Sequence, residues 1–157
     1  MGNIILRSAE ARDIPDILRL LSQVNLVHHT IRPDLFNLAT KYSEEDLKAL
    51  LQTENRFTYA AESDGVFLGY IFCELQQIVG NPLRTEILTF YIDDLCVDEA
   101  ARGKDVGRAL YEYAKAQAKA MGCYHVTLHV WEGNDRAEGF YRKCGLTNMY
   151  TCLEEIL

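Results

Sequence analysis

The sequence lacks the features that mark membrane, secreted and nucleic-acid-binding proteins. No apolar run approaches the ~20 residues that cross a membrane, and the start of the chain does not resemble a secretory signal peptide. We therefore expect a cytoplasmic protein with no membrane partner. Basic residues are in deficit, since 16 Lys and Arg stand against 23 Asp and Glu and give a net charge of −7. Broad nucleic-acid binding needs clustered basic side chains that displace counterions, so we expect no nucleic-acid partner.

Closely spaced cysteines are absent as well. The five cysteines are odd in number and include no C-x-x-C spacing. Most of them have apolar neighbours, which favours reduced thiols in the core over a disulfide framework or a zinc site. A chain of 157 residues, 48% of them apolar and 25% charged, can bury a core without such links. We expect one domain over residues 1–157 and no metal.

Hydrophobic spacing and turn signals predict a mixed α/β order. Apolar residues recur at helical spacing from Ile14, and Pro15 fits the first turn of that helix. The turn residues at 63–65 are a strong hairpin signal. In chain order we expect a strand at 3–7, a helix from 14 that ends before a loop at 28–34, a helix capped by Ser43, strands at 56–62, 66–77 and 85–97, a helix at 106–121, a strand at 124–130, a helix at 135–143 and one or two strands in the tail 146–157. This order describes one mixed α/β domain.

The segment 98–105, between a predicted buried strand and a predicted helix, has the residues of an anion site. A helix N-terminus offers free N–H groups and the positive end of the helix dipole. Gly103 and Gly107 allow close approach of a phosphate or pyrophosphate, and Arg102, Lys104 and Arg108 add positive charge. A plain strand-to-helix turn with solvated basic residues would have the same composition. Neither the P-loop nor the dinucleotide-binding glycine pattern is present.

Two segments together resemble the signatures of the GNAT superfamily of N-acetyltransferases. Arg102 to Gly107 is similar to its acetyl-CoA loop, and Asn134 to Leu146 is similar to its second motif. The motifs follow in the expected order, and the resemblance spans the chain. It implies an α/β fold with a central mixed, mostly antiparallel sheet, flanked by about four helices and splayed between the two parallel strands that end at Val97 and Val130.

The resemblance also implies the place of the co-substrate. The pantetheine arm of acetyl-CoA would pass between the splayed strands, the pyrophosphate would rest on the amides of residues 103–108, and Asn134 would hydrogen-bond the arm. Tyr141 would lie near the thioester sulfur and serve as the acid for the leaving thiolate, although a packed aromatic beside Phe140 is the plainer reading. The implied binding residues are Leu95, Cys96, Val97, Arg102, Gly103, Lys104, Asp105, Val106, Gly107, Arg108, Asn134 and Tyr141.

Asp105 departs from the family pattern, because it stands where the first motif glycine is expected. A carboxylate about 4 Å from a phosphate would cost roughly 4 kcal/mol at an effective dielectric of about 20. Asp is, however, a favoured N-cap and tolerates positive φ better than most residues. We therefore expect its side chain to point away from the phosphates.

Two groups compete for the role of the base that keeps the acceptor amine neutral. His129 lies on a predicted strand, five residues before Asn134, and titrates near neutral pH. Asp93 and Asp94 lie where a strand should be buried, and a β-bulge would explain why they do not alternate. They would relay a proton through water or bind the acceptor's ammonium group. The alternative for His129 is a structural role. The alternative for Asp93 and Asp94 is a rim position beside solvent.

The segment 28–34 follows the first helix, where relatives commonly form a wall of the acceptor site. Its polar residues are His28, His29, Arg32 and Asp34. Arg32 in the cleft would favour an acceptor with a carboxylate or phosphate, whereas dominance of Asp34 and Asp93 would favour a polyamine, an aminoglycoside or a lysine side chain. A metal site is the alternative interpretation of these residues. However, the side chains of adjacent histidines point in different directions, and the sequence places no further ligand beside them.

The sequence thus predicts a GNAT-type enzyme that moves an acetyl group from acetyl-CoA directly to a primary amine of a small molecule or protein, with coenzyme A as product. A homodimer paired through the β-rich tail is compatible with it. The alternatives are a non-catalytic acyl-CoA-binding or sensor domain of the same fold, and an unrelated phosphate binder that would bind nucleotides without a pantetheine slot.

Overall fold

One sheet organises the chain, and its strand order follows the sequence. The computed structural model describes residues 2–157. The strands pair in the order β1-β2-β3-β4-β5. Their bounds are β1 Ile5–Ser8, β2 Arg56–Ser63, β3 Val66–Gln77, β4 Leu88–Val97 and β5 His125–Thr127. The first four strands pair antiparallel, and β4 pairs parallel with β5.

Helices cover both faces of this sheet, and each face has its own apolar core. Helices α1 (Ile14–Ile31) and α2 (Glu44–Leu50) pack on one face, while α3 (Val106–Ala120) packs on the other, with α4 (Asp135–Lys143) beside it. Short 3₁₀ turns, η1 (Ala11–Asp13) and η2 (Glu99–Ala101), precede α1 and follow β4. This arrangement confirms the predicted mixed α/β fold. None of the helices described in residues 2–157 is long and apolar enough to span a membrane.

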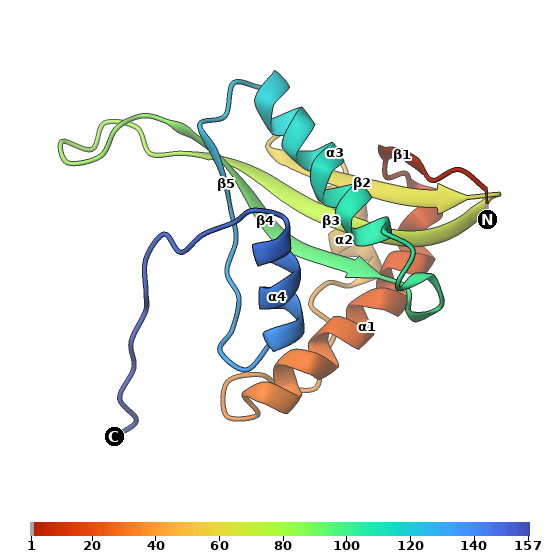
Figure 1. Ribbon diagram of the computed structural model, residues 1–157, viewed down its shortest axis with the longest axis horizontal. Helices are drawn as coiled ribbons and strands as arrows, with labels where there is room; N and C mark the ends of the chain where they lie inside the picture. Colours follow the sequence, from red (N-terminus) through yellow and green to blue (C-terminus); the bar gives the residue numbers. More distant parts are fainter. Residues whose placement is uncertain (1) are drawn as a thin grey trace.

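The sheet opens between its two parallel strands, as predicted, but the second of them ends at Thr127 and not at Val130. Strands β4 and β5 share three residue pairs, of which Tyr91 with Thr127 is the last. Strand β4 continues to Val97, whereas the chain after β5 turns away from it (Figure 1). The edge of β4 that faces β5 is therefore unpaired over its last six residues, 92–97. The opposite edge of the same residues pairs with β3.

Two local predictions about the strands are confirmed. Strands β2 and β3 are joined by Asp64 and Gly65, whose φ angles of 52° and 76° are those of a tight hairpin turn. Strand β4 contains the expected bulge, because Phe72 of β3 lies opposite Asp94 while the next residue, Cys73, lies opposite Ile92.

Two other predictions are wrong. Helix α1 continues through the expected loop and includes His28 and His29 in its last turn. Nothing before Pro33 stops the helix, and histidines suit the negative end of a helix dipole. The tail 146–157 contains no strand, because β-propensity forms a strand only where a paired edge is available. Beyond Leu146 its backbone makes no hydrogen bond to the other described residues, and it runs away from α4 as an extended segment (Figure 1).

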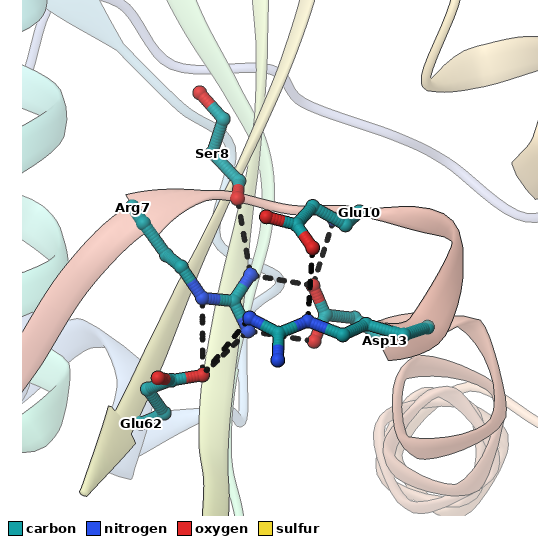
Figure 2. A network of polar contacts seen from close by, with 6 residues as sticks. Arg7, Ser8, Glu10, Asp13 and Glu62 are labelled. Carbon is teal, nitrogen blue, oxygen red and sulfur yellow. Dashed lines mark hydrogen bonds and ion pairs between the residues drawn. The ribbon is translucent and has the colours of Figure 1, made fainter. Parts of the chain in front are cut away.

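An ion-pair network ties β1 to β2 and to the start of α1. Figure 2 shows the Arg7 guanidinium between the carboxylates of Asp13 and Glu62. Its nitrogens lie 2.7 and 2.9 Å from the Asp13 oxygens and 2.6 and 3.0 Å from Glu62 Oε2. The Asp13 side chain is only 6% exposed. Burial alone would raise the pKa of Asp13, but hydrogen bonds from Arg7 and the Glu10 amide hold the pKa below its usual value.

We predict that Arg7→Ala destabilises the protein by about 3 kcal/mol, because it leaves a buried carboxylate without its partner. Denaturant unfolding at neutral pH measures this change. The stabilisation is present above the unfolded pKa of Asp13 and is lost as the pH falls through its lower folded pKa. Arg12→Ala is the matched control: Arg12 pairs with Glu10 at 2.9 Å but is 62% exposed, so its loss should cost less than about 1 kcal/mol. Equal effects of the two variants would contradict the argument.

Candidate active site

The N-terminus of α3 presents a row of unused backbone amides. Within residues 2–157, the amides of residues 103–108 have no backbone acceptor, and the first bond into the helix runs from Ala109 N to Asp105 O at 2.9 Å. Gly103, at φ 75°, has open space where a Cβ would stand. A Cβ at Gly107 would lie 3.4 Å from the Phe140 ring and 3.5 Å from Val97 Cγ2. These amides therefore lie beside the end of β4 and the side of α4, in the arrangement that suits an anion.

Asp105 occupies the N-cap position of α3, as expected, but its side chain does not cap the helix. Its φ of 60° and ψ of 14° are left-handed, whereas a capping residue normally has extended backbone angles that bring its side chain to the N2 or N3 amide. The expected tolerance of positive φ is confirmed, and the expected capping bond is wrong.

The basic residues of this loop are exposed and only loosely held. Arg102 lies 3.4 Å from a Glu99 carboxylate oxygen, and Lys104 Nζ donates to Ala100 O at 3.0 Å. Arg108 is exposed on the first turn of α3. All three are within reach of the free amides without forming strong ion pairs of their own.

The predicted slot for the pantetheine arm has a free strand edge on one side and α4 on the other. Leu95, Cys96 and Val97 lie beyond the last pair with β5. The Cys96 thiol points away toward α1, 3.8 Å from Leu20 O, so this residue offers the slot its backbone. Asn134 is the N-cap of α4, and its Oδ1 accepts from Ala137 N at 3.4 Å.

Tyr141 projects from α4 into the same region. Its ring packs against the Phe140 ring, with centroids 5.1 Å apart. Tyr141 is therefore a packed aromatic residue, as the alternative interpretation predicts. Burial raises the pKa of Tyr141, and the negative charge of Asp94 raises it further. The phenol therefore stays protonated at neutral pH and lies within electrostatic range of that carboxylate.

The bulge in β4 places two adjacent carboxylates on the α1–α2 face of the sheet. Asp93 Oδ2 lies 2.7 Å from Lys41 Nζ and accepts a hydrogen bond from Tyr42 Oη at 3.1 Å. Asp94 accepts from the buried Tyr70 hydroxyl at 2.6 Å. The two carboxylates thus have different surroundings, one beside an ammonium group and the other beside a phenol.

Asp94 titrates near neutral pH in this setting. Burial raises the pKa of Asp94 to about 6, against the lowering effects of the Tyr70 hydrogen bond and the Lys41 charge, and the neighbouring Asp93 adds to the rise. A carboxylate with this pKa is ionised at pH 7 yet basic enough to accept a proton.

His129 lies after β5, with both ring nitrogens engaged. Its Nδ1 is 3.1 Å from Tyr91 Oη, and its Nε2 is 2.7 Å from Tyr150 Oη in the tail. The imidazole is exposed and has no carboxylate partner among the described residues. A nitrogen that already contacts a phenol is less available to an acceptor amine.

The C-terminal end of α1 forms an aromatic wall with two other segments. Phe36 lies between His28 and Trp131, with ring centroids 5.2 Å from each. His29 Nδ1 contacts Phe36 O at 2.6 Å. Burial lowers the pKa of His28, and the Lys41 charge lowers it further.

Arg32 is the cation of this wall, and carboxylates surround it. Its nitrogens lie 2.7 and 2.9 Å from the Asp34 oxygens, and it also pairs with Glu154 of the tail. Its charge is therefore already balanced. Across residues 2–157, no three His, Cys, Asp or Glu side chains gather in a way that would hold a metal ion.

Comparison with known proteins identifies this arrangement. A sequence model of the acetyltransferase (GNAT) family matches residues 24–146, which include both motifs, the bulge and the amide row. The chain belongs to the GNAT family of acetyltransferases. The GNAT assignment makes it an acyltransferase enzyme, and it overturns the interpretation of the loop as an unrelated phosphate binder.

Two proteins illustrate the similarity of this chain to others, one in sequence and one in structure. A stretch of 58 residues is 40% identical to the glucosamine 6-phosphate N-acetyltransferase of Arabidopsis thaliana, over 37% of each chain. The matched stretch thus spans little more than a third of that relative. The crystal structure of a mutant of the BH1408 protein from Bacillus halodurans is similar with a TM-score of 0.93 and 30% identity, over 98% of this chain and 99% of the other.

The crystal structure of the Arabidopsis thaliana glucosamine-6-phosphate N-acetyltransferase is also similar. It has a TM-score of 0.71 and 21% identity over 99% of both chains. At this identity the likeness extends to the fold alone.

The GNAT site contains several side chains that the sequence did not single out. All of them except Trp131, which packs against Phe36 of the aromatic wall, contact a predicted residue. They do so only through tertiary structure, so neither spacing nor periodicity could have found them. By contrast, the β-bulge in β4 is predictable from the sequence, because the two adjacent aspartates indicate it. The additional residues are Lys41, Tyr42, Tyr70, Tyr91, Trp131, Tyr150 and Glu154.

We predict that Asp105→Gly leaves acetyl-CoA affinity unchanged or tightens it, because the change relieves a left-handed non-glycine residue and removes a carboxylate near the phosphate site. Calorimetric titration measures the affinity. Asp64→Gly is the matched control, since Asp64 is also left-handed, at φ 52°, but lies in the β2–β3 hairpin; its affinity for acetyl-CoA should not change. Clear weakening by Asp105→Gly alone would show that the aspartate side chain helps to bind the co-substrate.

Proposed function

We propose that the protein transfers the acetyl group of acetyl-CoA to a primary amine of a small molecule or a protein, directly and within a ternary complex. The observation that carries this proposal is the meeting of the amide row at α3 with the unpaired edge of β4. Gly107 lies against Val97 and Phe140 at this point. One extended ligand with a pyrophosphate at one end and amide groups along its arm fits both features.

The co-substrate supplies an activated acetyl thioester, and the chain supplies the groups that hold it. The pyrophosphate rests on the amides of residues 103–108, with Arg102, Lys104 and Arg108 around it. The arm pairs with the edge of β4 at residues 95–97, which has no strand partner on the β5 side within residues 2–157. Asn134 donates to the arm through its amide nitrogen, since its oxygen caps α4.

Proton transfer is assigned to one group on each face of the sheet. Asp94 accepts the proton of the acceptor amine, directly or through water, and its raised pKa of about 6 suits a base that works near neutral pH. Tyr141 donates a proton to the departing thiolate, a base of similar strength to a phenolate. Asp93 holds the ammonium form of the acceptor, and His129 positions Tyr91 and Tyr150.

The charges around the acceptor side favour a cationic amine. Two basic groups on this side are already paired: Arg32 with Asp34 and Glu154, and Lys41 with Asp93. A polyamine, an aminoglycoside or a lysine side chain suits such a surface better than an anionic amine. The cytoplasmic location and the homodimer stay predictions.

Calorimetric titration with acetyl-CoA, coenzyme A and ADP tests the co-substrate. We expect acetyl-CoA and coenzyme A to bind and ADP to bind at least about tenfold more weakly, because ADP lacks the arm that pairs with β4. Amine-dependent release of thiol, with spermidine and glucosamine 6-phosphate as contrasting acceptors, then measures transfer. Binding without thiol release from any amine would favour the non-catalytic sensor. Absence of binding at millimolar acetyl-CoA would refute the proposal.

Tyr141→Phe is the matched variant for this measurement, because it removes only the hydroxyl. Turnover should fall far more than acetyl-CoA affinity, since the phenol acts on the leaving sulfur and not on the bound phosphates.

The pH dependence of transfer tests the base. In the wild type we expect kcat/KM to fall as the pH drops below about 6, because Asp94 becomes protonated there. Asp94→Asn should lower the rate by about 100-fold or more and remove this acidic limb. Initial rates of thiol release, measured between about pH 5 and 9 with acetyl-CoA near saturation, give the pH profile of transfer.

His129→Ala is the contrasting variant. We expect it to keep the acidic limb near pH 6 and to lose much less activity. If the limb and the rate vanish with His129→Ala and survive Asp94→Asn, the base is His129 instead.

A further inference from the structure

A primary amine of the chain itself already lies against the candidate catalytic carboxylates. Lys41 Nζ is 2.7 Å from Asp93 Oδ2, and the same oxygen accepts from Tyr42 Oη at 3.1 Å. Asp93 is adjacent to Asp94, the proposed proton acceptor. An ammonium group of the protein thus occupies the position at which Asp93 would hold the ammonium group of an acceptor.

Lys41 lies at the exposed rim of the candidate site, beside the carboxylates of β4. It lines the same cavity as Asp94, Leu95 and Tyr141. Its charge lowers the pKa of Asp94, although burial raises that pKa more, and so the ammonium group acts on the carboxylate that would deprotonate it. Its side chain is 40% exposed, which leaves Nζ accessible from the cavity.

The segment that carries Lys41 is held by side chains and not by backbone hydrogen bonds. Residues 37–42 lie between α1 and α2 and have no regular structure. Their backbone makes no hydrogen bond to the described residues 2–157. The flexible four-carbon stem of lysine adds further reach. Movement of Nζ toward the end of β4 therefore breaks two side-chain contacts, the ion pair with Asp93 and the contact with the Tyr42 ring, whose centroid lies 5.5 Å from Nζ.

We propose that Lys41 is an acetylation site of the protein itself, modified from acetyl-CoA in the same active site. This inference rests on the proposed function. The Lys41 ammonium gives one proton to Asp94. The neutral amine then forms a C–N bond with the acetyl carbonyl carbon, the C–S bond breaks, and the sulfur leaves with the electron pair. The second amine proton is lost to solvent, Tyr141 protonates the thiolate, and the proton held by Asp94 passes through water to the Tyr141 phenolate. The products are therefore acetyl-lysine, coenzyme A and one proton, with both residues restored.

The modification would change the acceptor side of the site. Acetyl-lysine is neutral and cannot pair with Asp93. The Asp93 carboxylate would then be free to hold the ammonium group of an incoming acceptor. Self-acetylation thus removes an internal competitor for the position that a cationic substrate needs.

Peptide-resolved mass spectrometry of the full chain after incubation with acetyl-CoA tests this inference. Lys48 is the internal control, because it also pairs with carboxylates, at 2.9 and 3.0 Å, and is 48% exposed, but it lies on α2. We expect Lys41 to gain one acetyl group at least about 100-fold faster than Lys48, because only Lys41 is positioned beside the reacting groups. Lys41→Arg should remove this fast addition, and Lys48→Arg should leave it in place.

Asp94→Asn separates enzymatic from chemical acetylation. We expect it to slow modification of Lys41 by about 100-fold and to leave that of Lys48 unchanged. Similar rates at the two lysines, or an unchanged rate at Lys41 in Asp94→Asn, would overturn the inference. If acetyl-CoA binds and added amines are acetylated while Lys41 stays unmodified, only this inference fails. If acetyl-CoA does not bind at all, the proposed function fails and this inference fails with it.

Discussion

The loss of pairing between β4 and β5 is the constraint on which the rest of the site depends. Three residue pairs hold these parallel strands together, ending at Tyr91 and Thr127, and β4 then continues alone to Val97. Backbone groups on this edge have no strand partner within residues 2–157. The proposed function assigns this edge to the extended arm of the co-substrate. Helix α3 begins just beyond it, so the positive end of its dipole lies where such a ligand would bring its negative charge.

The β-bulge is a second consequence of the same strand. A regular strand would point Asp93 and Asp94 to opposite faces, and one of them would enter the apolar core beneath α3. The extra residue turns both toward α1 and α2, where Lys41 neutralises one and a tyrosine hydroxyl stabilises the other. Two neighbouring carboxylates thus acquire different surroundings, which is the usual way in which a pair of like groups divides binding and proton transfer.

The sequence predicts the parts of the structure that depend on local chemistry. The left-handed turn at Asp64 and Gly65, the capping box at Ser43 and Asp46, and the start of α4 after Asn134 all follow from residue type and short-range spacing. Contacts between distant segments do not. Tyr70 reaches Asp94 only because of the β3–β4 register, and Lys41 reaches Asp93 across 52 positions of the chain.

The tail error has the same origin, because strand formation there depends on an adjacent strand edge that local β-propensity does not reveal. The error at the end of α1 is local, because Pro33 is the first residue that stops the helix. A helix persists until something stops it, and a strand forms only beside a partner.

The two halves of the site are held in different ways, and this difference bears on how the family can vary. The co-substrate half consists of backbone: free amides at α3 and an open edge of β4, which most side-chain changes leave intact. The acceptor half rests on side-chain contacts between segments without regular structure, such as Arg32 with Glu154 and His129 with Tyr150. Exposed polar contacts of this kind contribute little stability, so their residues can change at small cost to the fold. In the proposed function, the main chain therefore fixes the donor site, whereas the acceptor site depends on side chains that can change.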